Sequence, residues 1–188
     1  MNHGIQPDLH EGNRIFCKSV VSLENACHPV PFGASCCPMK HIATALDFSD
    51  ASDSVLNAAM AMAQSQQATL HIVHVLEPQP SYTAYGMTPE EFPAIQLFQE
   101  ESQKRAEAKL HEALATARQQ VGDVRIELMI GSPLHAIIDY VKEKSIDLIV
   151  IGSHGHGAVA ALLIGSVAEG LVRKAICPTL VIPCHIPS

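Results

Sequence analysis

Short apolar runs alternate with longer amphipathic segments along the chain from Met39 onward. The runs are rich in Ile, Val and Leu and are bounded by turn residues, which is typical of strands covered by helices on both faces. The longer segments repeat apolar residues at helical spacing. This alternation predicts an α/β fold in which β-α-β units wind around a parallel sheet. Five strands are expected, at residues 41–46, 70–76, 124–130, 147–151 and 179–183.

Four helices are expected between these strands. One follows Ser49, and a long one spans about residues 94–120. A third starts at Ser132, because serine is a preferred N-cap and Pro133 suits the first helical position. The fourth starts at Ser166, where the sequence S-x-x-E has the form of a capping box. The arrangement is an open, Rossmann-like five-stranded parallel sheet with helices on both faces, for which the strand order 3-2-1-4-5 is expected.

The first 38 residues differ from the rest. They carry no sustained helical or strand period and are interrupted by prolines and glycines, so we expect a disordered extension at 1–38 and one folded domain at 39–188. Cys17, Cys27, Cys36 and Cys37 lie in this extension, but their spacing lacks the paired C-x2-C pattern of structural zinc sites. The proline-containing segment 77–93 could be a lid over a site or a disordered loop, and both readings stay open.

The charge balance excludes some partners. The chain has 12 Lys and Arg against 19 Asp and Glu, a formal net charge of −7, which repels the phosphate backbone of nucleic acids. No apolar run approaches the roughly 20 residues of a membrane-spanning helix, and the N-terminus lacks the pattern of a signal peptide. We therefore expect a soluble cytoplasmic protein with no nucleic-acid partner and no membrane span.

Glycines gather after the fourth expected strand, in the sequence Gly152-Ser153-His154-Gly155-His156-Gly157, and Gly165-Ser166 follows. In an open parallel sheet, ligands bind at the carboxyl ends of the strands where the strand order reverses. Glycine lets the backbone approach a ligand, and the N-terminus of the following helix favours an anion such as phosphate. The alternative is a glycine-rich turn before an ordinary capped helix. A Ser166 hydroxyl engaged in capping could not also hold a phosphate oxygen.

The spacing Gly152-x2-Gly155-x9-Gly165-Ser166 resembles the ATP-binding signature of the universal stress protein family, G-x2-G-x9-G-[S/T], without a gap. The resemblance covers nearly all of residues 39–188. It includes Asp47-Phe48-Ser49 after the first strand, His74-Val75 at the end of the second, and the closing Cys177-Pro178-Thr179-Leu180-Val181-Ile182.

The resemblance implies a role for matching positions. Asp47 would approach the nucleoside and the Val75 backbone would meet the adenine. Backbone N–H groups of Gly165, Ser166 and Val167 would face the outer phosphates, which Mg²⁺ would bridge without a protein ligand. The remaining members of the implied ATP-binding set are Ala45, Gly152, Gly155 and Ala168, with the two glycines under the ribose and α-phosphate.

Several of these residues could instead have a purely structural role. Asp47 could only cap the helix after Ser49, and Ser166 could only cap its own helix. His154 and His156 are expected near phosphate as hydrogen-bond donors rather than as a metal pair. By the same reasoning, the two histidines of the second strand, His71 and His74, are expected to be packing or strand-end residues.

Three classes of function fit the sequence. The first is a nucleotide-dependent regulatory module of the stress-response kind, and the second is a slow ATPase or adenylyl-transferring enzyme. The third, a nucleotide-free partner-binding protein, is disfavoured by the intact glycine pattern. No G-x4-G-K-[S/T] loop is present, and no Lys or Arg lies between Gly152 and Gly165, so at most slow hydrolysis is expected.

An apolar edge strand at 179–183 predicts a homodimer, as the resemblance also implies.

A chain that begins at Met39 should fold and bind its ligand as well as the full chain does, because residues 1–38 lack the periodicity of core elements. Melting temperatures of the two chains, measured side by side, test this boundary. A substantially lower value for the shortened chain would place the extension in the folded structure.

Overall fold

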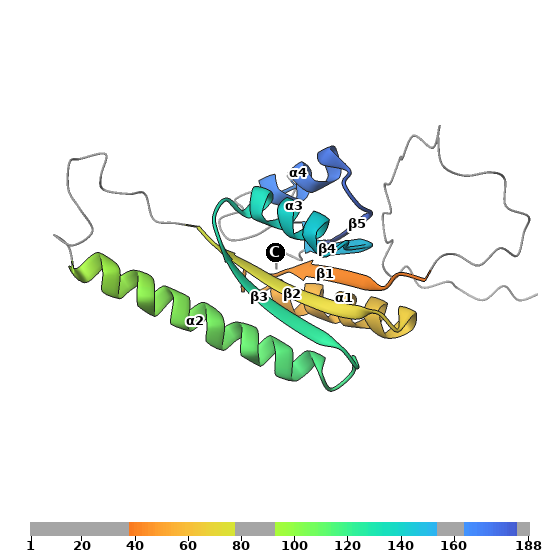
Figure 1. The fold of residues 1–188 in the computed structure, drawn as a ribbon, viewed down its shortest axis with the longest axis horizontal. Coiled ribbons are helices and arrows are strands. Elements are labelled where there is room, and N and C mark those ends of the chain that lie inside the picture. Colours follow the sequence, from red (N-terminus) through yellow and green to blue (C-terminus); the bar gives the residue numbers. More distant parts are fainter. Residues whose placement is uncertain (1–37, 78–92, 154–163, 184–188) are drawn as a thin grey trace, which may run out of the picture.

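The computed structural model describes residues 38–77, 93–153 and 164–183, apart from the side chains of 93–96. The fold is shown in Figure 1. The expected extension, the segment 77–93 and Gly155 lie wholly or almost wholly outside these ranges, so what was expected of them stays a prediction. The elements are β1 (His41–Ala45), α1 (Ser52–Gln66), β2 (Thr69–Leu76), α2 (Pro93–Ala117), β3 (Val124–Ile130), α3 (Pro133–Glu143), β4 (Leu148–Gly152), α4 (Ser166–Lys174) and β5 (Thr179–Ile182).

All five strands pair in parallel in the order β3-β2-β1-β4-β5, which confirms the predicted fold. Helices α1 and α2 cover one face of the sheet, and α3 and α4 cover the other (Figure 1). Most element bounds match the expected ones closely. The long helix α2 ends earlier than expected, at Ala117, and a turn carries the chain on to Val121.

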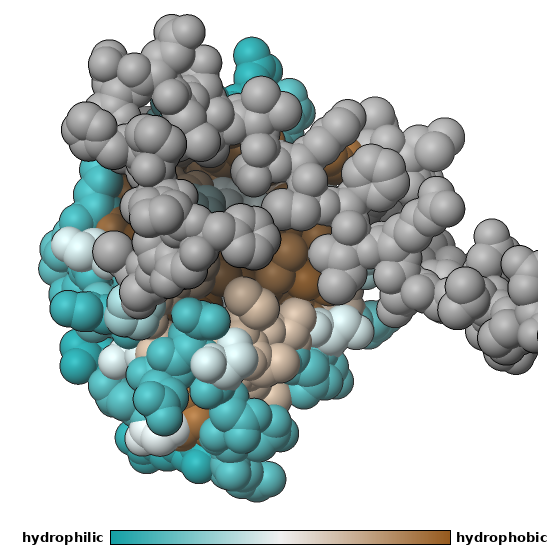
Figure 2. Space-filling view, turned by 90° about the vertical axis from the view of Figure 1, so that its right-hand side faces the viewer, coloured by the Kyte–Doolittle hydropathy of each residue, from teal (hydrophilic) through white to brown (hydrophobic). Residues whose placement is uncertain are grey.

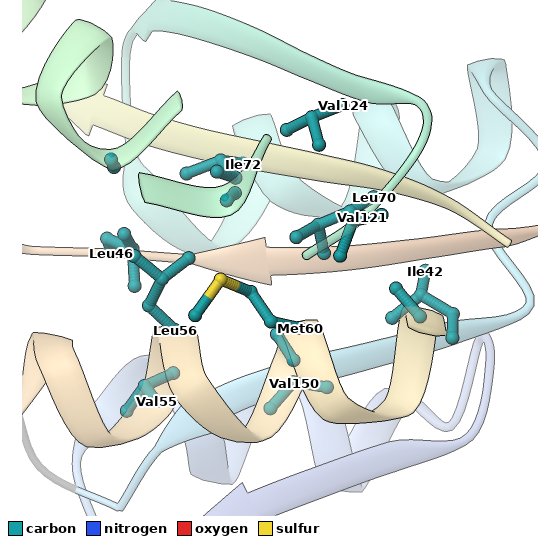
Figure 3. Packing of buried hydrophobic residues seen from close by; sticks show 14 of the residues in the cluster. Ile42, Leu46, Val55, Leu56, Met60, Leu70, Ile72, Val121, Val124 and Val150 are labelled. Atoms are coloured by element: carbon teal, nitrogen blue, oxygen red, sulfur yellow. The ribbon is translucent and has the colours of Figure 1, made fainter. Parts of the chain in front are cut away.

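The face under α1 and α2 holds the larger apolar core. Alternate strand residues such as Ile42, Leu70 and Ile72 are fully buried and meet Met60 of α1 and Leu110 of α2. Figure 3 shows the side chain of Met60 lying between α1 and the strands. In the side view of Figure 2, hydrophilic residues cover the lower part of the described surface, where these helices lie, so the helix layer is amphipathic.

The opposite face is packed by α3 and α4. Leu171 of α4 and Ile149 of β4 are fully buried there, beside Ile137 of α3. Gly170 lies where α4 passes α3 closely, since an added Cβ would sit 2.5 Å from Cδ2 of Leu134. The absence of a side chain at Gly170 therefore leaves room for the end of the Leu134 side chain between the two helices.

The start of β1 is fixed by a carboxylate. Asp147 Oδ2 accepts hydrogen bonds from the backbone N–H groups of Lys40 (2.7 Å) and His41 (2.9 Å), and the Asp147 N–H donates to the His41 carbonyl at 2.8 Å. Asp147 lies just before β4 rather than in it, contrary to the expected bound. The contact ties the start of β1 to the segment that leads into β4.

Ser132 is the N-cap residue of α3, as predicted, with Pro133 in the first turn, but its side chain makes no capping hydrogen bond. Its Oγ lies 3.2 Å from Nδ1 of His135 instead. The position was thus readable from sequence, whereas the hydroxyl's partner was not. None of the helices in the described ranges is both long and apolar enough to cross a membrane.

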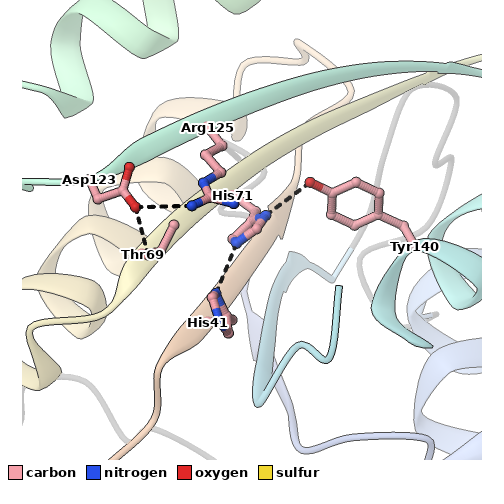
Figure 4. Close-up of polar contacts among 6 residues, drawn as sticks. All are labelled: His41, Thr69, His71, Asp123, Arg125 and Tyr140. Atoms are coloured by element: carbon pink, nitrogen blue, oxygen red, sulfur yellow. Dashed lines mark hydrogen bonds and ion pairs between the residues drawn. The ribbon is translucent and has the colours of Figure 1, made fainter. Parts of the chain in front are cut away.

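A buried histidine links the sheet to α3 near the amino ends of the strands. His71 is 1% exposed; its Nδ1 lies 2.9 Å from the Tyr140 hydroxyl and its Nε2 lies 3.3 Å from Nδ1 of His41 (Figure 4). Burial, and then the nearby charges of His41, Arg125 and Lys144, lower the pKa of His71 to about 4, although Asp123 acts in the opposite direction. The expected packing role of His71 thus comes with polar partners on both ring nitrogens.

The free energy of unfolding should fall as the pH drops from about 6.5 to about 4. The unfolded chain binds a proton at the ordinary histidine pKa of 6.5, whereas folded His71 resists it down to about 4, so its contribution of about 3 kcal/mol is complete above pH 6.5 and is lost on acidification. Urea unfolding of the parent and a His71→Leu, Tyr140→Phe double variant across this range measures it. The variant should lose this part of the pH dependence. Equal slopes in both proteins, or an NMR titration of His71 near pH 6.5, would contradict the assignment.

Candidate functional site

A cavity of about 600 Å³ opens at the carboxyl ends of β1, β2 and β4. The strand order reverses at this place, because the chain leaves β1 toward β2 on one side and returns to β4 on the other. Such a crevice is where open α/β sheets bind ligands. Every predicted site residue in the described ranges lines it, namely Ala45, Asp47, Val75, Gly152, Gly165, Ser166, Val167 and Ala168. Their roles in binding stay predictions.

Asp47 organises the turn between β1 and α1. Its Oδ1 accepts hydrogen bonds from the Ser49 backbone N–H (3.1 Å), the Ser49 hydroxyl (2.7 Å) and the Ser52 hydroxyl (3.2 Å). The N-cap of α1 is Ala51, which forms no side-chain capping bond. Asp47 thus closes a local turn and reaches the first residue of α1 while also lining the cavity.

The N-terminus of α4 forms the opposite wall. Its N-cap residue is Gly165, with extended φ and ψ of −60° and 152°, and this residue forms no side-chain capping bond. The predicted capping box at Ser166 is therefore wrong: Ser166 is already helical, and Glu169 lies 3.3 Å from Arg173 on the helix surface. Since Ser166 is not the N-cap, its hydroxyl is not committed to that role.

The Gly165 N–H has a partner of its own. It donates to the Ser153 carbonyl at 2.7 Å, which ties the start of α4 to the end of β4. The implied role of this N–H toward phosphate stays a prediction. The first-turn N–H groups of Ser166 and Val167 have no acceptor within the helix, and the helix dipole adds partial positive charge there. The positive end of α4 is thus carried by backbone groups.

The end of β2 extends past the end of β1. The last paired residues are Ala45 and Val73, while Val75 pairs only with Met129 of β3. Backbone groups alternate in direction along a strand, and Val73 accepts a bond from Leu46 on the β1 side. The backbone groups of Val75 therefore point to the same side, where β1 has ended and the cavity begins.

His74 has a role that the sequence did not reveal. Its Nδ1 lies 2.6 Å from the Leu46 carbonyl oxygen, and its ring lies 4.6 Å from that of Phe48. The expectation of a packing or strand-end residue did not include this bond, because strand periodicity indicates the face on which His74 lies but not its hydrogen-bond partner. The predicted strand order places β1 beside β2, so it could have indicated that His74 lies near the residues that follow β1. Other lining residues that sequence analysis did not select include Ser49, Ser52, Glu77 and Ile137.

The charged side chains among the described lining residues are acidic, Asp47 and Glu77. No Lys or Arg appears among those lining residues, and no group of three metal-ligating side chains occurs in the described part of the chain. An anion would therefore meet the α4 N-terminus, and ligand hydroxyls could donate to the carboxylates. Gly155, His154 and His156 lie outside the described residues.

Comparison with known proteins gives consistent matches. The universal stress protein family model matches residues 38–183. Universal stress protein YxiE of Bacillus subtilis is 32% identical over 142 residues, covering 73% of this chain and 95% of that protein. The solved universal stress protein UspA of Lactobacillus plantarum has a TM-score of 0.68 at 26% identity, covering 77% of this chain and 97% of that one.

Two further solved structures are of universal stress proteins with bound nucleotides. One is in complex with cAMP (TM-score 0.58, 22% identity, 77% of this chain and 97% of that one). The other, from Archaeoglobus fulgidus, is in complex with dAMP (TM-score 0.54, 23% identity, 77% of this chain and 97% of that one). At these identities they support the fold. The family-model match spans most of the chain, and the YxiE relative agrees with it, so this protein belongs to the universal stress protein family.

Proposed function

We propose that the protein is a regulatory module that binds an adenine nucleotide, with ATP and Mg²⁺ as the ligand, in the cavity at the carboxyl ends of β1, β2 and β4. The observation that carries the proposal is that two sets of backbone hydrogen-bonding groups face the same cavity from different walls. The N-terminus of α4, whose N-cap residue is a glycine without a capping side chain, suits phosphate, and the Val75 backbone faces the cavity from the end of β2.

The parts of a nucleotide find complementary groups. The Val75 backbone offers a donor and an acceptor to the edge of adenine, and the Asp47 carboxylate lies where ribose hydroxyls could donate to it. Ser166 and Val167 would take the phosphates. The complexes of two relatives with cAMP and dAMP support an adenine nucleotide as the ligand class.

Mg²⁺ is part of the proposal for an electrostatic reason. A triphosphate would enter a cavity whose charged described side chains are the carboxylates Asp47 and Glu77, so its own charge must be neutralised. The donors at α4 suit a phosphate oxygen but carry only partial charge. A cation held between phosphate oxygens supplies the rest without a protein ligand.

A binding role fits better than rapid catalysis. Phosphoryl transfer needs positive groups aimed at the charge that develops in the transition state, and no Lys or Arg is found among the described lining residues. Release of labelled phosphate from ATP, at stoichiometric and at catalytic enzyme concentrations, distinguishes a module from a slow ATPase.

Replacing Gly165 with Val should weaken ATP binding at least tenfold. Gly165 has φ of −60°, so valine suits the backbone, but its branched side chain would stand at the α4 N-terminus where the phosphates are proposed to lie. Gly122→Val is the matched control, since nothing lies within 4 Å of an added Cβ there. Calorimetry with ATP and Mg²⁺ measures both.

The control should bind like the parent, and melting curves should show that all three proteins are folded. Parallel titrations with AMP, cAMP and dAMP rank the ligands, and titrations without Mg²⁺ test the cation. Equal ATP affinity in Gly165→Val and the parent would remove phosphate binding from α4.

The proposal also includes a homodimer through β5. This strand pairs with β4 on one side, and no described strand lies on its other side. Carbonyls of Pro178 and Ile182 accept bonds from β4, so the backbone groups of the alternate residues Thr179 and Val181 point to the outer edge. A second copy could pair there about a two-fold axis.

Val181→Pro should shift the protein from dimer to monomer. Proline removes an N–H that points outward, and it leaves the bonds between β5 and β4 to the neighbouring residues. Val181→Ala shortens the same side chain but keeps the N–H, so it should stay dimeric. Light scattering over a range of concentrations gives the masses; a dimeric Val181→Pro protein would place the interface elsewhere.

A further inference from the structure

We infer that His74 is a positioning residue for the nucleotide base. Its imidazole donates a hydrogen bond to the Leu46 carbonyl and thereby ends the hydrogen-bond ladder between β1 and β2. The Val75 backbone is then left facing the cavity. The inference rests on the proposed function, because it assigns the part of the cavity that distinguishes one base from another. It concerns a residue that lines the cavity but that the glycine signature does not include.

The register of the two strands shows what His74 replaces. Ala45 pairs with Val73, and the Leu46 N–H donates to the Val73 carbonyl at 2.9 Å. In a parallel ladder the next bond would run from the Val75 N–H to the Leu46 carbonyl. That carbonyl oxygen lies 2.6 Å from Nδ1 of His74. The side chain thus stands in for the backbone donor at the point where the ladder ends.

The chemistry of this bond determines that the His74 ring carries a proton on Nδ1. A carbonyl oxygen can only accept, so Nδ1 carries a proton and donates it. A buried carbonyl at a strand end would otherwise be costly, because a polar group without a partner loses its hydration. The His74 bond removes that cost while the chain turns away from β2 into the Asp47 turn.

Neighbouring groups hold the ring in place. Phe48, which has φ of 59° in the left-handed region, packs its ring 4.6 Å from His74 at an interplanar angle of 42°. Lys109 of α2 places its Nζ 5.3 Å from the centre of the Phe48 ring. Asp47, the residue before Phe48, is bound to Ser49 and Ser52. His74 therefore connects β2 to the turn that carries Asp47.

The first experiment needs no ligand. Amide hydrogen exchange, followed by NMR on the full chain, should show fast exchange at Val75 in the parent. In His74→Leu the Leu46 carbonyl loses its imidazole partner and can accept from Val75 instead, so exchange at Val75 should slow at least tenfold. His74→Asn should behave like the parent, since its amide nitrogen is the same number of bonds from Cβ as Nδ1.

The second experiment uses ATP and GTP, each with Mg²⁺, in calorimetry. We expect His74→Leu to bind ATP about tenfold more weakly and to lose most of the parent's preference for ATP over GTP. His74→Asn should keep both. His111→Leu is the control for removing an imidazole, because His111 is exposed on α2 and does not line the cavity.

The outcomes separate the two proposals. A parent that binds neither nucleotide overturns the proposed function, and the exchange experiment then still decides the role of His74 in the ladder. A parent that binds ATP, together with a His74→Leu variant of equal affinity and preference, overturns the inference alone. Weak binding by both Leu and Asn, with equal losses for ATP and GTP, would reduce His74 to a structural residue and also overturns it.

Discussion

The position of β1 in the middle of the sheet determines most of this structure. β1 pairs with β2 on one side and with β4 on the other. The helices that lead into these two neighbours, α1 and α3, lie on opposite faces of the sheet. The chain leaving β1 must then diverge from the chain leaving β4, and the space between them cannot be filled by a further strand. The cavity is thus a consequence of topology, and side chains only determine what it can hold.

Polar side chains secure both ends of β1. At its start the Asp147 carboxylate accepts two backbone N–H groups, and beyond its end Asp47 and His74 bind the turn. Each of these contacts satisfies backbone or hydroxyl groups that lie outside the ladder. The central strand is therefore held by groups far apart in the sequence, and its turn into α1 is defined without a capping side chain on that helix.

The fold was predictable from the sequence because period and turn chemistry are local. Continuous apolar runs gave the strands, and Ser132-Pro133 gave the start of α3. The glycine signature located the cavity wall, since Gly152 and Gly165 do line it. Hydrogen-bond partners were not predictable in the same way. The choice of Gly165 over Ser166 as the N-cap depends on how separate strands are placed against one another. The bond between His74 and Leu46 depends on the same placement.

The two polar clusters also differ in what they demand of the fold. His71 is buried with Tyr140 and His41 near the amino ends of the strands, whereas His74 stands at the carboxyl ends beside the cavity. Two histidines of one strand, three residues apart, face opposite layers because side chains alternate along a strand. Their separation places one histidine in the buried interior and the other at the cavity, near opposite ends of the sheet.

The close approach of α3 and α4 at Gly170 limits how the protein could be stabilised by design. Glycine inside a helix costs about 1 kcal/mol relative to alanine, which makes position 170 an obvious candidate for replacement. An alanine there would press on Leu134 at 2.5 Å, and α4 would have to move or Leu134 would have to repack. If α4 is the part that moves, the shift reaches its N-terminus about one turn away, where the same helix presents Ser166 and Val167 to the cavity.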